Sequence, residues 1–136
     1  MTALITVKIG KASFDARLRD DLAPRTCERF RALLPLVQRM AHVRWSGEAC
    51  WIPLGDFDLG VGLENATSHP APGDFIFYPG GVSEAEILLA YGGVRFASKA
   101  GQLAGSPFLT LVSNLETLHG VGHDMMWSGA QEVRFD

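Results

Sequence analysis

Two apolar runs carry the strongest structural signal in this sequence: Gly73-Asp-Phe-Ile-Phe-Tyr78 and Glu86-Ile-Leu-Leu-Ala-Tyr91. Both runs are short and rich in aromatic or branched residues. The first is followed by Pro79-Gly80-Gly81 and the second by Gly92-Gly93. Short apolar runs bounded by turn residues are typical of buried β-strands. The sequence therefore predicts two strands here, joined by a turn.

Further strands are expected on both sides of this pair. Apolar residues alternate with polar ones over residues 4–9 and 14–18, around Gly10-Lys11, which predicts an opening β-hairpin. The other expected strands are residues 42–45, 48–52, 108–113 and 132–135. Ser46-Gly47 predicts a tight turn that would place Trp45 opposite Glu48 and His42 opposite Trp51. Residues 53–72 and 94–106 are expected to be loops.

Two helices are predicted between the strands. Pro24, preceded by two acidic residues, suits the first turn of a helix. Apolar residues then follow at helical spacing, at Cys27, Phe30, Leu34 and Val37, with a kink or break expected at Pro35. A second, short helix is expected after Asn114, which can cap it.

The composition agrees with one domain spanning residues 1–136. The chain has 136 residues, of which 47% are hydrophobic and 15 are glycine, and its net charge is −3. This glycine content disfavours a helical bundle. The order of elements predicts a mainly β fold: a closed or nearly closed barrel of about eight strands with one long and one short α-helix.

The same numbers exclude several classes of protein. Seven arginines lie between Arg17 and Arg44, but the chain as a whole is acidic, and nucleic-acid binding needs a larger basic surface. No apolar run is long enough to span a membrane, and the first residues lack the features of a signal peptide. We therefore expect a cytoplasmic protein in which Cys27 and Cys50 are buried thiols.

A family resemblance begins in the first predicted helix. The segment Asp21-Leu-Ala-Pro24-Arg-Thr26-Cys-Glu28-Arg-Phe30-Arg31-Ala32-Leu33 resembles the first helix of cyclophilins, with Asp, Pro, Thr, Glu, Phe, Arg, Ala and Leu at matching spacing. Beyond residue 40 the resemblance to true cyclophilins ends. Their Gln-Gly-Gly run and their Asn-Gly-Ser-Gln-Phe-Phe type segment have no counterpart here. The proline-isomerase site is therefore not carried over.

The remainder of the chain is similar to a smaller bacterial group of cyclophilin-like proteins, mostly without an assigned function. Their second half contains Pro-Gly-Asp, an aromatic strand ending in Tyr-x-Pro-Gly, and a strand ending in glycine. Here these are Pro72-Gly73-Asp74, residues 75–80 and residues 86–92. The block from Arg44 to Ala49 and the tail after Leu118 resemble one uncharacterised family of that group. The resemblance implies a cyclophilin-like barrel and no particular activity.

The first candidate site combines Arg44, Trp45, Glu48 and Trp51. A hairpin would bring them together, and a guanidinium between indoles can bind an anionic or planar small molecule. The alternative is a core tryptophan pair beside a structural Arg–Glu contact. The second candidate is Tyr78 with Glu84, Glu86 and Tyr91, where burial could make the Glu86 carboxyl a general base. The alternative is a solvated glutamate beside a turn.

A metal site is the weaker hypothesis for His119 and His123. Residues four apart share a helix face, as in zinc-binding pairs, but Gly120 and Gly122 make this a poor helix. Two unrelated surface histidines are favoured, and neither a metal nor a cofactor is predicted.

The sequence thus predicts a barrel protein that binds a small polar or carboxylate-bearing metabolite. Arg44 would bind the carboxylate, Trp45 and Trp51 would pack on the ligand, and Tyr78 would line the pocket. Glu48 or Glu86 would be the acid or base if the protein is an enzyme. Two alternatives stay open: a peptidyl-prolyl isomerase, and a non-catalytic homo-oligomer assembled through the C-terminal aromatics Trp127 and Phe135.

Overall fold

A computed structural model describes residues 3–136. Within these residues the strands are β1 (Leu4–Ile9), β2 (Ala12–Leu18), β3 (Leu36–His42), β4 (Gly47–Gly55), β5 (Asp74–Tyr78), β6 (Ala85–Val94), β7 (Ala97–Ser98), β8 (Gly101–Gln102), β9 (Ser106–Leu111) and β10 (Gln131–Phe135). The helices are α1 (Pro24–Arg31), the 3₁₀ turn η1 (Leu115–Thr117) and α2 (Leu118–Ser128).

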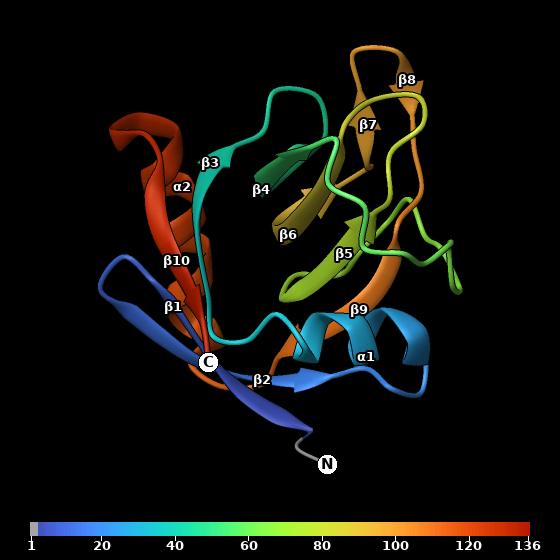
Figure 1. The fold of residues 1–136 in the computed structure, drawn as a ribbon. Coiled ribbons are helices and arrows are strands. Elements are labelled where there is room, and N and C mark those ends of the chain that lie inside the picture. The colour runs from blue at the N-terminus through green and yellow to red at the C-terminus, as the bar shows by residue number, and fades with distance from the viewer. Residues whose placement is uncertain (1–2) are drawn as a thin grey trace.

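Eight of these strands form a closed antiparallel barrel in the order β1-β10-β3-β4-β6-β5-β9-β2 (Figure 1). The predicted fold class is therefore confirmed. Closure gives every barrel strand two neighbours, so that no barrel edge is open to another chain. β7 and β8 pair outside the barrel as a separate two-stranded hairpin.

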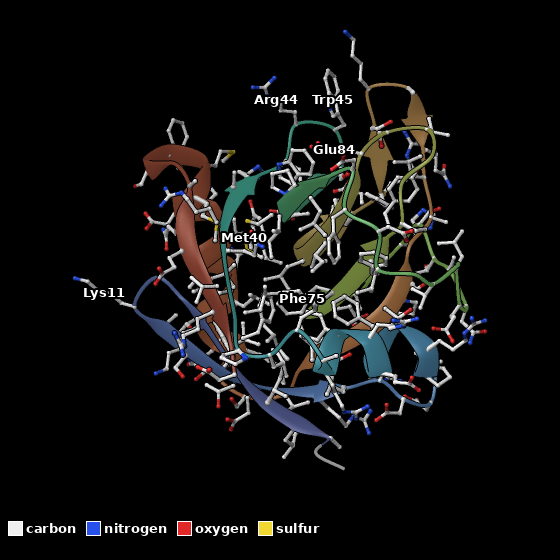
Figure 2. The ribbon with its side chains drawn as sticks, in the orientation of Figure 1. Lys11, Met40, Arg44, Trp45, Phe75 and Glu84 are labelled. Atoms are coloured by element: carbon white, nitrogen blue, oxygen red, sulfur yellow. The ribbon has the colours of Figure 1, made fainter. Side chains whose placement is uncertain are left out.

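Alternate residues of the barrel strands fill its interior. Met40 of β3 and Phe75 of β5 point inward (Figure 2), and both are fully buried. On β6 the inward residues are Ile87, Leu89 and Tyr91, which belong to the same apolar cluster. The residues between them on β6 therefore face outward, because successive side chains of a strand alternate.

The two helices lie at opposite ends of this interior. Phe30 of α1 packs its ring edge-on against Phe108 and Phe135, with centroids 4.9 and 5.2 Å apart. Gly122 of α2 lies instead against Tyr91, whose hydroxyl is 2.8 Å from Nε2 of His42 at the far end of β3. The helices thus cover the apolar side chains that the barrel would otherwise expose at its two openings.

A carboxylate distant in sequence stabilises the start of α1. The Glu64 carboxylate accepts hydrogen bonds from the backbone N–H groups of Arg25 (3.2 Å) and Thr26 (2.8 Å), and from the Thr26 hydroxyl (2.8 Å). Pro24 occupies the first turn, where its missing N–H costs nothing. An acceptor at this end also complements the helix dipole.

The outer face of β5 and β6 carries a second apolar cluster. Its buried members are Ala49, Ile76, Tyr78, Leu88, Phe96 and Leu103. The Tyr78 and Phe96 rings meet edge to face at 5.7 Å. The segment around residues 95–105, predicted to be a plain loop, therefore contains the β7–β8 hairpin and covers part of the barrel wall.

Two local predictions are wrong. α1 ends at Arg31, and Val37, expected on the helix, lies in β3 and is 45% exposed. Pairing of β3 with β10 decides this segment in favour of a strand. The β3–β4 connection has four residues, 43–46, where a two-residue turn was expected. His42 therefore pairs with Cys50, and Ala41 pairs with Trp51.

The C-terminal region also differs from expectation. α2 forms despite its glycines, and it is longer than α1, with 11 residues against 8. Phe135, expected to be free for an oligomer interface, is fully buried against Phe30, whereas Trp127 is 76% exposed. Cys27 and Cys50 are free and buried, as predicted. Neither helix in residues 3–136 has the length and apolarity needed to cross a bilayer.

Candidate functional site

A pocket of about 910 Å³ lies outside the barrel wall formed by β3, β4 and β6. Its rim comprises residues 43–46 after β3, residues 82–84 before β6, and residues 97–100 of the β7–β8 hairpin. Figure 2 shows Arg44, Trp45 and Glu84 together at this upper edge of the molecule, with the first two extending outward. Three separate loops thus meet over one patch of the barrel wall.

The alternation of side chains along β4 and β6 determines which residues form the floor of the pocket. Cys50 and Ile52 of β4 point into the barrel, so Trp51 and Pro53 point out. Glu86 of β6 is the direct partner of Pro53 and shares its face. An indole, a proline ring and a carboxyl group therefore form adjacent parts of one surface.

The rim residues Arg44 and Trp45 stand on a loop that is tied to the β7–β8 hairpin. The Ser46 hydroxyl donates to the Ala97 carbonyl and accepts from the Ala97 N–H, both at 3.0 Å. The Arg95 N–H donates to the Ser46 carbonyl at 3.1 Å. These bonds fix the base of the loop and leave the Arg44 and Trp45 side chains exposed above the pocket.

Glu86 is the unusual member of the pocket. It is 6% exposed, and its carboxyl makes no hydrogen bond or ion pair within residues 3–136. Burial, and secondarily the negative charge of Glu84, raises its pKa to about 8. The carboxyl is therefore mainly protonated at neutral pH and can exchange a proton near that pH.

Ser83 lines the same pocket and carries a buried hydroxyl. Its oxygen is buried and has no hydrogen-bond partner in the part of the chain that the structure describes. Buried polar groups are normally hydrogen-bonded. Two residues with unpartnered polar groups, Ser83 and Glu86, therefore border the same pocket.

Four of the six residues predicted for a site border this pocket: Arg44, Trp45, Trp51 and Glu86. Tyr78 does not line it. Its ring is buried in the second apolar cluster, and its hydroxyl accepts a hydrogen bond from the Val82 N–H at 3.0 Å. Tyr78 therefore positions the loop that carries Ser83.

Glu48 lies elsewhere, beside α2. Its carboxylate accepts hydrogen bonds from the Gly93 N–H at 3.0 Å and from His119 Nε2 at 3.1 Å. These two bonds, that of Gly93 first, lower the pKa of the Glu48 carboxyl. Glu48 therefore does not line the pocket that Glu86 and both tryptophans border.

The α2 side holds a second polar cluster. His42 Nε2 lies 2.8 Å from the Tyr91 hydroxyl, and the Tyr91 ring meets the His119 ring edge-on at 5.2 Å. The rings of His119 and His123 stack with centroids 5.9 Å apart. Within residues 3–136 no three His, Cys, Asp or Glu side chains are grouped as metal ligands.

Sequence reasoning missed Ser83 and Lys99 as pocket residues. Both lie in segments interpreted as turns or loops, and neither has a distinctive motif. Glu84, which was noted beside Glu86, does reach the rim.

The sequence model of a family described as a protein of unknown function, DUF3830, matches residues 5–136. The chain belongs to this family. No curated protein sequence matches this DUF3830 chain. Its fold is similar to that in the structure of McbB in complex with tryptophan, with a TM-score of 0.73 and 19% identity over 96% of this chain. The match covers 43% of McbB, so the DUF3830 chain spans less than half of that protein.

A second structural neighbour matches nearly end to end. The solution structure of the hypothetical protein AF2241 from Archaeoglobus fulgidus has a TM-score of 0.65 and 16% identity. The match covers 98% of the DUF3830 chain and 93% of AF2241. At these identities the two neighbours bear on the fold alone, and the closed barrel fits the cyclophilin-like architecture that the sequence implied.

Proposed function

We propose that this DUF3830 protein binds a small carboxylate-bearing metabolite in the pocket outside β4 and β6. The observation that carries the proposal is the pocket itself: about 910 Å³, with Arg44, Lys99 and the Trp45 indole on its rim and the Trp51 indole in its floor. Ligand sites are typically concave and largely apolar, with a few polar groups that orient the ligand. An arginine fork matches a carboxylate, and flat indoles match a planar or apolar body.

The bound state of one structural neighbour supports this ligand class. McbB was solved with tryptophan, a molecule that has a carboxylate and a planar apolar side chain. Tryptophan is therefore a suitable first probe for the DUF3830 pocket. Cytoplasmic function is part of the proposal, because two free thiols are typical of a reducing compartment.

Any chemistry at this site is assigned to Glu86 and not to Glu48. A general acid or base must lie within reach of the ligand and exchange protons near the working pH. Glu86 borders the pocket and has a pKa of about 8, raised by burial, whereas Glu48 lies outside the pocket and contacts His119.

The test is calorimetric titration of the full chain with tryptophan and other small carboxylates. We expect Arg44→Ala to weaken carboxylate binding by about 10- to 100-fold, as loss of a charged hydrogen bond does. The matched control is Arg17→Ala, an exposed arginine on β2 away from the pocket. Equal binding by wild type and Arg44→Ala, or no binding of any carboxylate, would contradict the proposal. Isomerisation of a proline peptide at high protein concentration would instead favour the isomerase alternative.

A further inference from the structure

Ionisable side chains of both signs line the pocket. Arg44 and Lys99 come from the β3–β4 connection and the β7–β8 hairpin, and Glu84 and Glu86 come from the β5–β6 turn and β6. His42 also borders the pocket, but both of its ring nitrogens are engaged, Nδ1 at the Val43 carbonyl and Nε2 at the Tyr91 hydroxyl. The other ionisable groups of the pocket are thus a cationic pair, Arg44 and Lys99, and an acidic pair, Glu84 and Glu86, carried by different elements.

The segment that carries the acidic pair contains polar groups without partners among the described residues. Glu86 is 94% buried and unpaired, and the buried Ser83 oxygen is also unpaired, within residues 3–136. Leaving such groups unsatisfied costs free energy, and a bound ligand can satisfy them. A protonated amine suits these groups, because it supplies three N–H donors and a positive charge for Glu84 and Glu86.

We propose that Glu86 and Ser83, with Glu84 at the rim, form a subsite for the protonated amine of an amino acid whose carboxylate binds Arg44. The side chain of that amino acid lies between Trp45 and Trp51. This inference rests on the proposed function, which supplies the carboxylate end, and narrows the ligand class from carboxylates to zwitterionic amino acids with a flat or apolar side chain.

Binding of the amine has a measurable protonic consequence. In the free pocket Glu86 keeps its proton at pH 7, because burial and then the charge of Glu84 raise its pKa to about 8. An ammonium group nearby favours the carboxylate form. Glu86 then passes its proton to solvent as the ammonium–carboxylate pair forms, and the ligand keeps all three of its own N–H protons. The ligand carboxylate neutralises the positive charge of the cationic pair, Arg44 and Lys99.

The experiment compares three probes on the full chain by calorimetry at pH 7, in buffers of low and high ionisation enthalpy. The probes are tryptophan, indole-3-propionate, which lacks the amine, and tryptamine, which lacks the carboxylate. We expect tryptophan to bind at least tenfold more tightly than indole-3-propionate. Release of a proton, approaching one, is expected with tryptophan and tryptamine and not with indole-3-propionate.

Variants of Glu86 and Ser83 test whether this subsite causes the proton release and the tighter binding of tryptophan. Glu86→Gln should abolish proton release and reduce tryptophan affinity to that of indole-3-propionate, whose own affinity should change little. Ser83→Ala should also lower the affinity for tryptophan relative to the affinity for indole-3-propionate. Glu132→Gln, at an exposed site on β10, is the matched control and should behave as wild type.

The outcomes separate this inference from the proposed function. Equal affinity and equal proton release for tryptophan and indole-3-propionate would overturn the amine subsite and leave the carboxylate site standing. If tryptamine binds and indole-3-propionate does not, the ligand carboxylate is not what Arg44 recognises. That outcome would overturn both the carboxylate site and the proposal of a zwitterionic ligand. Failure of all three probes to bind would contradict both. The wild-type comparison decides these points even if Glu86→Gln does not fold.

Discussion

Gly122 of α2 rests directly on the ring of Tyr91 in β6, and a Cβ atom at position 122 would overlap that ring. This contact brings the backbone of α2 against the end of the barrel, where the Cys50 thiol also points at the Gly122 carbonyl. Glycine lowers intrinsic helix propensity. α2 nevertheless forms, because close packing on the barrel offsets that cost.

Replacement of Gly122 should therefore destabilise the protein. We expect Gly122→Ala to lower the free energy of unfolding by about 1–3 kcal/mol, as overpacking of a tight site does. Gly120→Ala is the control, because no described atom beyond the helix backbone and its chain neighbours lies within 4 Å of its Cβ position. That change should be neutral or stabilise by up to about 1 kcal/mol. Urea unfolding measures both, and equal effects would contradict the packing role of Gly122.

The buried Glu86 carboxyl should make stability depend on pH. Its pKa is raised, by burial first, from 4.5 to about 8. Between these pH values the folded protein keeps a proton that the unfolded chain releases, so the free energy of unfolding falls as pH rises. The stabilisation by protonated Glu86 is fully present below pH 4.5 and is lost above about pH 8. At 1.36 kcal/mol per pKa unit its upper limit is roughly 5 kcal/mol.

A comparison of variants isolates this contribution. Urea unfolding at several values between pH 5 and about pH 9 should show a steeper loss of stability for wild type than for Glu86→Gln, because glutamine does not titrate. Glu132→Gln should retain the wild-type slope. Parallel slopes for wild type and Glu86→Gln would show that Glu86 is not buried as described.

The long-range cap of α1 can be tested in the same way. Glu64→Ala removes an acceptor of two backbone N–H groups and of the Thr26 hydroxyl, and we expect a loss of about 1–2 kcal/mol, as for other helix caps. Glu28→Ala, an exposed position on α1 itself, should change stability by less than about 0.5 kcal/mol. A loss at Glu28 as large as that at Glu64 would contradict the capping role.

The two cysteines should be unreactive in the folded protein. Burial raises the pKa of the Cys27 thiol to about 11 and that of the Cys50 thiol to about 12, so little thiolate exists at pH 8. An aromatic disulfide reagent should label both thiols quickly in urea and neither in buffer. Rapid labelling of the folded protein would show that one of these sites opens to solvent.

Much of the barrel could be predicted because alternation and turn residues are local signals. Glu48 and Trp51 show how far such reasoning reaches. They are three residues apart, so any strand containing both puts them on opposite faces. The tight turn predicted at Ser46-Gly47 would pair Trp45 with Glu48 but would still leave Trp51 on the other face, and the structure has a four-residue connection instead. A shift of one residue in pairing moves a whole set of side chains to the other face.

Other features depend on contacts that no local signal contains. The burial of Glu86 results from loops covering the outer barrel wall, one of them supported by the hydrogen bond between Tyr78 and Val82. The end of α1 depends on β10, whose Phe135 pairs with Leu36 and so draws residues after Arg31 into the sheet. Long-range pairing overrides helical spacing in such a segment.

The pocket and the barrel interior share no buried side chain among the described residues. Exchanging Arg44, Trp45 or Trp51 therefore opens no void inside the barrel, and repacking the interior leaves the rim chemistry intact. Recognition and folding can consequently diversify separately in the DUF3830 family: one scaffold can acquire new ligand preferences through its three loops without rebuilding the closed sheet beneath them.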